Sequence, residues 1–454
     1  MAKDKLTDYD STTASNNTDI GGVSIAEGML PSNVNNSMRE LTKQLGAFAD
    51  GTDGVDVLKL QDDTDTNSIK LQAPASVTAT TTFTLPDGDG SADQVLKTDG
   101  SGQLGFADRH PNPSLIINGA ATVNQRGDST GVTSTGYYGP DRFQLLYTDA
   151  GTWSISQSST VPEGFANSYK LDCTTAKASL AANSRLFVQT KLEGQNLQHL
   201  KKGTSNAVST TLSFWVRSNK TGTYQVNIED NDNIRIIGST YAISSADTWE
   251  YKEVTFAGDT SGVLGDDNGD SLVLMWALVA GTDNSSGAVP TAWEAKSNTD
   301  RGAGLTVNLA DSTSNEWYIT GVKLEVGETA TPFVHRSYGE ELALCQRYYY
   351  NTYITPQASG SATDGIIAGT FNAGDRYAVR YIFPTTMRAD PSVVFYGGRS
   401  TVADTADRVA VYNSDTLRSF ASEPSSRKQG VYGFFDTNST EDALRFHFTA
   451  NAEL

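Results

Sequence analysis

The 454-residue sequence predicts a mainly β protein that forms an elongated fibre of associated chains. Three observations support this prediction. Only 37% of the residues are hydrophobic and 41 are glycines, as expected when many short strands are joined by turns rich in Ser, Thr, Asn and Asp. One stretch near the N-terminus has heptad spacing. The β-type runs that follow it are too short to enclose a core of their own.

The chain is strongly acidic, because 53 Asp and Glu against 34 Lys and Arg give a net charge of -19. Such a charge repels phosphate backbones, so we expect no nucleic acid partner. Cys173 and Cys345 lie far apart and indicate buried thiols rather than a disulfide framework or zinc site. No apolar run reaches the ~18 residues of a membrane span, and the first residues lack a signal peptide's apolar core. We therefore expect folding in a cytoplasm without membrane insertion.

Residues 1–23 form a polar arm with few apolar anchors, which we expect to dock on a partner. Residues 24–50 carry helical signals. Ser24 and Glu27 match a capping box, and Pro31 ends the short helix that it starts. Ser32 is placed to cap a second helix, which ends at Gly51.

Apolar residues of this second helix recur at alternating spacings of four and three, which is the pattern of a coiled-coil seam. The seam consists of Val34, Met38, Leu41, Leu45 and Phe48. An isolated helix of ~15 residues is marginal in water, so this one needs partners, and we predict copies of itself. The alternative is a helix lying on the core of its own chain.

Residues 51–110 predict a thin β shaft and linker. Val55–Leu60, Ser68–Leu71 and Val77–Leu85 are short β-type runs that we expect to complete their burial against neighbouring chains. Asp87-Gly88-Asp89 begins like a calcium loop but lacks the Glu that supplies the bidentate ligand at position 12, so we predict no metal there.

The strings SIAEGMLPSNVNNSMRELTKQL (24–45) and DGDGSADQVLKTDGSGQLGFA (87–107) resemble the N-terminal and shaft segments of tailed-bacteriophage tail fibres. This resemblance covers about the first quarter of the chain. It implies a homotrimer whose residues 1–23 attach to the virion, at a tail, baseplate or adaptor protein. It identifies a structural role and no chemistry.

A larger body is predicted at residues 111–338, beginning after the Pro111–Pro113 hinge. Roughly ten short β-type runs separated by Gly, Asn and Asp turns indicate a two-sheet sandwich of jelly-roll type. The runs are Ser114–Ile117, Phe143–Tyr147, Trp153–Gln157, Ser168–Asp172, Leu186–Lys191, Val208–Arg217, Gly222–Ile228, Trp249–Phe256, Leu272–Ala280 and Glu316–Glu325. We expect Trp215, Trp249, Trp276 and Trp317 to pack in the core.

The run WYITGVKLEVGETATPF (317–333), followed by YGEELALCQRYY (338–349), resembles the end of the carbohydrate-binding-like jelly roll of phage fibre proteins and the linker to their C-terminal tip. The residues themselves predict a helix over Glu340–Tyr350, acidic at its start as the helix dipole prefers. We therefore predict a helical linker at residues 339–352.

Residues 353–454 predict a second, smaller β-sandwich. Its expected strands are Gly365–Phe371, Tyr377–Phe383, Ser392–Tyr396, Arg408–Tyr412, Gly430–Phe435 and Leu444–Phe448. From Glu340 onward 10 Lys or Arg and 13 Asp or Glu leave a charge of -3, and nearly all these cations are Arg. Such a tip suits an anionic surface glycan. Surface solubilisers and salt bridges between chains are the alternative.

Catalytic chemistry is poorly supported by the sequence, so we predict no enzyme and no cofactor. His110, His199, His335 and His447 lack the spacing of a metal or acid–base site, and no nucleophile elbow, phosphate loop or dinucleotide fingerprint occurs. Glycan hydrolysis needs only two carboxylates, but no internal repeat of the β-helix kind is present. Asp266–Asp270 offers a calcium loop or, in preference, a solvated turn.

Sugar recognition needs an aromatic face and polar groups for hydroxyls, and a few loops carry both. One candidate loop combines Tyr137, Tyr138 and Arg142, and a second combines Tyr396 and Arg399 with Arg408 and Tyr412 nearby. The glycines beside these rings let a ligand approach the backbone, although any tight turn shows the same pattern.

Together these features predict a virion tail fibre, assembled in the host cytoplasm, that binds a host cell-surface polysaccharide through its distal β domains. Tethering three copies would multiply the strength of weak sugar sites. A structural fibre without a receptor is the first alternative, and a glycan-degrading tailspike is the second.

Overall fold

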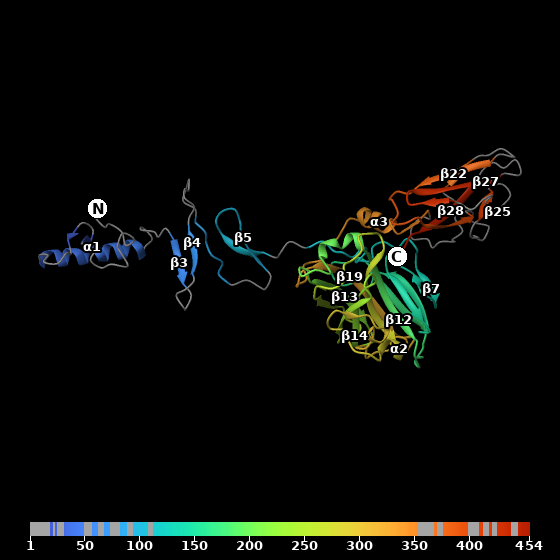
Figure 1. Cartoon of the computed structure of the whole chain (residues 1–454), viewed down its shortest axis with the longest axis horizontal. Helices are drawn as coiled ribbons and strands as arrows, with labels where there is room; N and C mark the ends of the chain where they lie inside the picture. Colours follow the sequence, from blue (N-terminus) through green and yellow to red (C-terminus); the bar gives the residue numbers. More distant parts are fainter. Residues whose placement is uncertain are drawn as a thin grey trace. The chain divides into compact units, whose positions relative to one another are not determined.

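The computed structural model describes residues 19–20, 23–24, 31–49, 57–61, 68–72, 82–88, 94–107, 112–352, 367–369, 376–397, 408–411, 417–419, 425–436 and 444–454. The chain divides into two compact units, Met1–Ala107 and Asp108–Leu454. The described residues are mainly β, arranged in antiparallel sheets, which confirms the predicted fold class (Figure 1).

The described residues of the first unit form one long helix and three small hairpins. Helix α1 spans Pro31–Ala49. Ser32 was expected to precede this helix as its cap, but it lies inside the first turn. Ser24, the expected start of a short helix, is the last residue of strand β2, and the rest of that helix lies outside the described residues. The hairpins pair β1 (Asp19–Ile20) with β2 (Val23–Ser24), β3 (Val57–Gln61) with β4 (Ser68–Gln72), and β5 (Val95–Thr98) with β6 (Leu104–Ala107).

The β5–β6 hairpin turns at Asp99, whose carboxylate accepts hydrogen bonds from the backbone of Ser101 (2.7 Å) and Gln103 (3.1 Å). Gly102 has a φ of +98° and approaches the carbonyl of Thr82 so closely that a side chain has no room. The strands leave apolar side chains in solvent, since Val95 is 46% and Leu96 55% exposed. The hairpin therefore does not bury its own apolar surface.

The second unit is built around a sandwich of two antiparallel sheets. One sheet has six strands in the order β16-β13-β19-β11-β10-β7, and the other has seven in the order β18-β15-β14-β17-β12-β9-β8. The strands are β7 (Ser129–Val132), β8 (Gly136–Tyr137), β9 (Gln144–Thr148), β10 (Thr152–Ser158), β11 (Ser168–Thr175), β12 (Arg185–Glu193), β13 (Thr210–Ser218), β14 (Gly222–Asp230), β15 (Arg235–Ile243), β16 (Glu250–Phe256), β17 (Asp270–Ala280), β18 (Glu294–Ala295) and β19 (Glu316–Val326).

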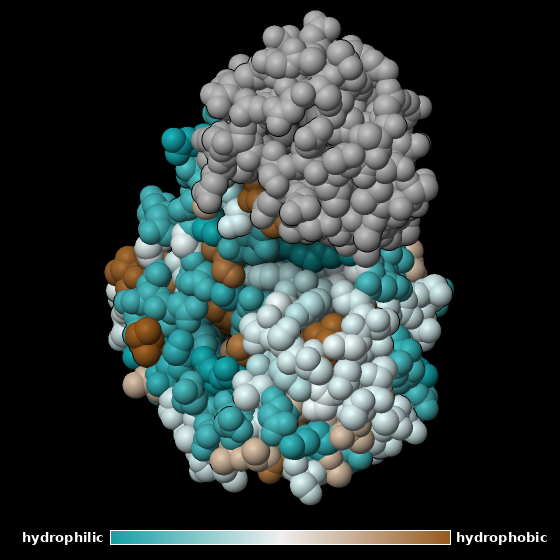
Figure 2. Space-filling model, turned by 90° about the vertical axis from the view of Figure 1, so that its right-hand side faces the viewer, coloured by the Kyte–Doolittle hydropathy of each residue, from teal (hydrophilic) through white to brown (hydrophobic). Residues whose placement is uncertain are grey.

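Short helical turns join these strands: η3 (Gly194–Asn196), η4 (Gln198–Leu200), α2 (Thr282–Ser285) and η5 (Asn298–Asp300). The core between the sheets is rich in aromatic rings. Trp276 is fully buried, with the ring of Phe214 at 5.8 Å in a T-shaped contact, and Trp153 and Trp317 are equally buried. On the face shown in Figure 2, the coloured residues are mostly hydrophilic or of intermediate hydropathy, and the hydrophobic side chains form small, separate patches.

Most predicted strands of the body are present. The prediction for Ser114–Ile117 is wrong: its backbone joins β19 by one bond, from Leu115 to Leu324 (2.8 Å), and Asn118 then turns the chain with a φ of +60°. Strand β15, which pairs along the whole of β14, was not predicted. Its Gly238 makes room for the side chain of Asn227.

The described residues at the end of the chain form a helix and two further sheets. Helix α3 (Tyr338–Gln346) starts with a capping box between Ser337 and Glu340 and ends before the predicted Tyr350, because β20 (Tyr349–Asn351) pairs with β28. One sheet joins β20, β21 (Ile367–Gly369), β23 (Ser392–Gly397), β24 (Arg408–Val411), β25 (Leu417–Ser419) and β28 (Leu444–Asn451), and the other joins β22 (Arg376–Ile382), β26 (Ser425–Arg427) and β27 (Gly430–Asp436).

The sandwich and this C-terminal part belong to one compact unit, although the sequence suggested separate domains joined by a linker. Arg347 pairs with Glu193 of β12 through two hydrogen bonds (2.6 and 2.8 Å). Arg388 donates to the carbonyl of Asn268 (2.7 Å), in the loop before β17. These charge-assisted bonds hold the two parts together.

Candidate functional site: an aromatic groove on the six-stranded sheet

The outer face of the seven-stranded sheet is covered by residues 281–305, which we call the covering segment. Glu229 of β14, 2% exposed, receives two hydrogen bonds from Arg301 (2.6 and 2.8 Å). Asn227 donates to the carbonyl of Arg301 (2.8 Å), and Gln225 donates to that of Asp300 (2.7 Å). Every polar side chain in this set has a partner, so this face is sealed.

The outer face of the six-stranded sheet is partly open. Leu212, Phe214 and Val216 of β13 point into the core, so alternation directs Ser213 and Trp215 outward. The Trp215 ring lies 5.4 Å from that of Tyr251 on β16, which is 44% exposed. This corrects the prediction for Trp215 and for Trp249, both of which lie outside the core.

Gly321 completes the floor between these rings. The pairing of β13 with β19 shifts register between Ser213 and Trp215, which marks a β-bulge in β19. Gly321 takes a φ of +62° at this bulge, and a Cβ there would lie 2.7 Å from the ring of Phe165 and 3.2 Å from that of Trp215. Only glycine fits this backbone and leaves space for both rings.

One wall is formed by residues 327–336, which we call the return segment, lying across the end of β19. Two fully buried charged side chains of β19 hold it. Lys323 donates to the carbonyls of Thr331 and Pro332 (both 3.1 Å), and Glu325 accepts from the backbone (2.8 Å) and hydroxyl (2.6 Å) of Thr331. The two charges are 3.0 Å apart, so each is compensated.

Phe165, from the loop between β10 and β11, packs against this wall. Its ring lies 5.3 Å from that of Phe333 and 5.0 Å from that of His335, both on the return segment. The Phe333 and His335 rings are 4.9 Å apart in an edge contact. Two segments distant in sequence therefore meet in one cluster of rings.

These elements enclose an open hollow of about 480 Å³, within the usual range of small-molecule sites. We call it the aromatic groove and define it by Phe165, Ser213, Trp215, Tyr251, Phe333 and His335. Its polar groups are a serine hydroxyl, a phenol and an imidazole. Burial raises the pKa of the Tyr251 phenol, a hydrogen bond with Ser213 acts in the opposite direction, and the charges of Glu253 and Glu325 raise the pKa further. A phenol is protonated at neutral pH, so this hydroxyl can donate a hydrogen bond. Such a surface can stack on the apolar face of a sugar ring and bind its hydroxyls.

The structure places the predicted loop of Tyr137, Tyr138 and Arg142 elsewhere. Arg142 is 1% exposed, with its guanidinium 3.5 Å from the centre of the Tyr348 ring and ion-paired with Glu453. Tyr137 donates to the carbonyl of Leu454 (3.0 Å), and Tyr138 hydrogen-bonds Ser134 (2.8 Å). Arg142 therefore does not line an exposed sugar site, because its charge joins the sandwich to the C-terminal strands.

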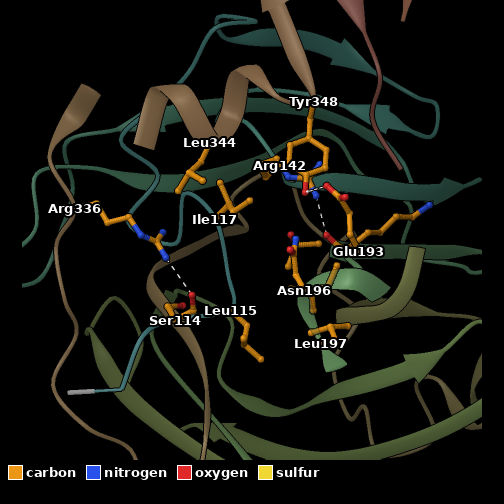
Figure 3. A pocket seen from close by; sticks show the side chains of 13 residues that line it. Ser114, Leu115, Ile117, Arg142, Glu193, Asn196, Leu197, Arg336, Leu344 and Tyr348 are labelled. Carbon is orange, nitrogen blue, oxygen red and sulfur yellow. Dashed lines mark hydrogen bonds between the residues drawn. The ribbon is translucent and has the colours of Figure 1, made fainter. Parts of the chain in front are cut away.

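Arg142 borders a second cavity, of about 240 Å³, between the sandwich and α3 (Figure 3). Figure 3 shows Arg336 pointing to Ser114, whose carbonyl accepts its hydrogen bond (3.0 Å), and Tyr348 meeting Glu193 (2.5 Å). Arg336 also pairs with Glu341 (3.2 Å). Since these charged groups already bind one another, the cavity belongs to the joint between the two parts of the unit.

The other predicted glycan residues are in the C-terminal part. Tyr396 lies in β23, opposite His447, and Arg408 lies in β24, opposite Ser419. Arg399 and Tyr412 lie outside the described residues, so that loop stays a prediction.

The predicted seam lies on α1. Val34 is 44%, Met38 65% and Leu45 50% exposed, and Leu41 is half-buried. The side chain of Phe48 is outside the description. Within the parts of the chain that the structure describes, no group of three His, Cys, Asp or Glu is placed to hold a metal. The described helices include none that is long and apolar enough to cross a membrane.

No known protein family and no curated protein matches the sequence. Similar solved structures include the enzymatically active domain of tailspike protein 4 from bacteriophage CBA120, at 10% identity and a TM-score of 0.25, over 47% of this chain and 21% of that one. A putative sugar-binding protein from Bacteroides thetaiotaomicron has 13% identity and a TM-score of 0.27, over 47% of this chain and 100% of that one. A family 11 carbohydrate-binding module from Clostridium thermocellum, in complex with a mixed-linked tetrasaccharide, has 11% identity and a TM-score of 0.23, over 45% of this chain and 98% of that one. The chain spans about a fifth of the tailspike domain's length.

Sequence reasoning missed every residue of the aromatic groove as a binding residue. A signal existed for Trp215, because the alternation with Leu212, Phe214 and Val216 points it away from the core. Phe165, Phe333 and His335 carried no such signal, since only the folded chain brings the loop and the return segment together.

Proposed function

We propose that this protein binds a glycan in the aromatic groove. The observation that carries the proposal is the Trp215–Tyr251 pair, which remains partly exposed beside the hollow, whereas Trp153, Trp276 and Trp317 are fully buried in the core. Exposed aromatic rings cost free energy unless a ligand covers them, and the apolar face of a pyranose is a matching surface. Because Gly321 has no side chain, the floor of the groove leaves room for a sugar ring.

Binding without cleavage is the activity that the groove favours. Hydrolysis of a glycosidic bond needs two carboxyl groups about 5 to 10 Å apart on either side of the bond. Among the described residues that line the groove, no Asp or Glu occurs. A glycan held there would therefore meet no acid–base pair.

We further propose that the chain is a phage tail fibre that attaches to the virion through residues 1–23 and presents the groove to a host polysaccharide. The support is the resemblance of residues 24–45, 87–107 and 317–349 to fibre proteins. The exposed seam on α1 and the exposed Val95 and Leu96 of β5 add to it, because a homotrimer would cover them. Three grooves on one fibre would bind a repeating glycan with high avidity.

A glycan array tests the binding proposal. The full-length protein is applied beside the Tyr251→Ala/Phe333→Ala double variant, which removes one ring from the floor and one from a wall. We expect the wild type to give glycan signals that the double variant loses. Signals that persist unchanged in a folded double variant would place the site elsewhere, and the absence of any wild-type signal would favour a purely structural fibre.

Light scattering tests the trimer. The wild type should have three times the 48.6 kDa chain mass, and Leu41→Asp, which puts a charge in the seam, should reduce it. A mass of 48.6 kDa for the wild type at micromolar concentration would contradict the trimer.

A further inference from the structure

The charge around the aromatic groove narrows the class of glycan, on the premise that the groove is the binding site. Its described lining contains no Lys, Arg, Asp or Glu. Among these described lining residues, Tyr251 and His335 are the titratable ones. A carboxylate or sulfate on a bound sugar would thus lose water without gaining a cationic partner, which is costly.

The charges just outside the lining make an anion still less favourable. Lys323, beneath the return segment, is fully buried and committed to Glu325 and Thr331, and Arg217, two residues from Trp215 on β13, is ion-paired with Asp247 (2.8 Å). Glu253 is exposed at the rim and accepts a hydrogen bond from the backbone of Ala330 (2.7 Å). Its negative charge acts on the Tyr251 phenol. The chain as a whole carries -19, so its long-range field also repels polyanions.

We infer that the aromatic groove selects an uncharged segment of glycan, built from neutral hexoses or deoxyhexoses, and rejects segments that carry uronic acid, sialic acid or sulfate. This differs from the anionic glycan that the arginines of the C-terminal part suggested. Here affinity comes from ring stacking and hydroxyl hydrogen bonds. These contacts are short-ranged and independent of salt.

The test uses one neutral polysaccharide that the array identifies and a derivative in which its primary alcohols are oxidised to carboxylates. Both are titrated into the full-length protein by calorimetry, at about 0.01 M and about 1 M salt, between which the Debye length falls from about 30 Å to about 3 Å. We expect the carboxylated polymer to bind at least about tenfold more weakly at low salt, equivalent to about 1.4 kcal/mol. Affinity for the neutral polymer should be unchanged by salt.

Two variants make the outcome specific to the groove. Glu253→Gln keeps the hydrogen-bond acceptor and removes the charge at the rim. It should therefore reduce the difference in affinity between the neutral and the carboxylated polymer a few-fold. Glu294→Gln, which changes an exposed glutamate of the covering segment, should leave that difference unchanged.

Each remaining outcome counts against one proposal. Equal or tighter binding of the carboxylated polymer, lost in Tyr251→Ala, would overturn the neutral selection and leave the groove as the binding site. Binding that Tyr251→Ala does not affect would overturn the proposed function itself.

Discussion

The two outer faces of the sandwich differ in how far they are covered by other segments of the chain. On the seven-stranded sheet, Glu229, Asn227 and Gln225 are buried beneath the covering segment, and each meets a partner there. On the six-stranded sheet, the return segment covers Lys323 and Glu325 but stops short of Trp215 and Tyr251. The first face is closed by polar contacts, and the second leaves apolar rings open.

This difference separates stability from binding. A buried polar group needs a hydrogen-bond partner within the chain, so the covering segment stabilises the folded state. A half-exposed ring leaves apolar surface for another molecule to cover, so the groove belongs to recognition. Variants on the first face should therefore change the free energy of unfolding, and variants on the second should change the affinity for glycan.

The largest effect is expected at Glu229. Glu229→Ala leaves two largely buried cations, Arg301 and Lys296, without their carboxylate, which should lower the free energy of unfolding by about 3 to 5 kcal/mol. Denaturant unfolding measures this loss, and glycan affinity of the folded fraction should not change. Glu294→Ala, at an exposed position of the same segment, should stay within about 0.5 kcal/mol. A large loss of glycan affinity in Glu229→Ala would contradict the assignment of stability to one face and of binding to the other.

A pH-dependent effect is expected at Asp141, a buried carboxyl where the sandwich meets the C-terminal part. It is 1% exposed and accepts hydrogen bonds from the backbone of Gln125 (3.1 Å) and from Arg126 (3.4 Å). Burial raises its pKa to about 6, above the ordinary 3.8. Because the folded state holds this proton more tightly, the contribution to stability is complete below about pH 4 and is lost as the pH rises through about 6.

The stability of the wild type relative to Asp141→Asn should consequently fall between about pH 4 and pH 7, by up to about 3 kcal/mol. Chemical unfolding at a series of pH values measures this difference. Asp266→Asn, which changes an exposed carboxylate, provides the control. A wild-type advantage that grows with pH would show that ion pairing with Arg126 outweighs burial.

A smaller effect is expected at Thr331, which we expect to contribute both to stability and to glycan binding. Thr331→Val removes the hydroxyl that bridges Lys323 and Glu325 and should cost about 1 to 3 kcal/mol of stability. Because the same residue positions Phe333 and His335, glycan affinity should fall as well. Thr329→Val is the matched change two residues earlier. Thermal unfolding and titration on the same samples measure both quantities, and an unchanged affinity would show that the wall does not depend on this anchor.

The smallest effect is expected at Tyr251→Phe, which keeps the ring and removes only the phenol. Loss of one hydrogen bond to a sugar hydroxyl is worth about 0.5 to 1.5 kcal/mol, or about threefold to tenfold in affinity. Stability should stay within about 0.5 kcal/mol, since the residue is at the surface. Titration calorimetry measures the change, and a loss as large as that of Tyr251→Ala would mean that stacking contributes little.

The sequence predicted the strands well and the site poorly, for a physical reason. Alternation and turn residues act over a few positions, so strands such as β13 and β17 could be recognised locally. The groove depends on contacts between positions 165, 215, 251 and 333, and on the bulge at Gly321, which no local pattern encodes. The buried Lys323 and Glu325 also appear as an ordinary charged pair on an exposed strand until the return segment covers them.

The measurement that tests the central claim most directly compares one tryptophan from each face. A neutral glycan is titrated by calorimetry into Trp215→Ala and into Trp293→Ala, which alters a partly buried tryptophan of the covering segment. Burying a large ring is worth about 1.5 to 3 kcal/mol, so Trp215→Ala should bind about 10 to 100 times more weakly than the wild type. Trp293→Ala should bind as the wild type does. Equal affinities in the two folded variants would contradict the assignment of glycan binding to the aromatic groove.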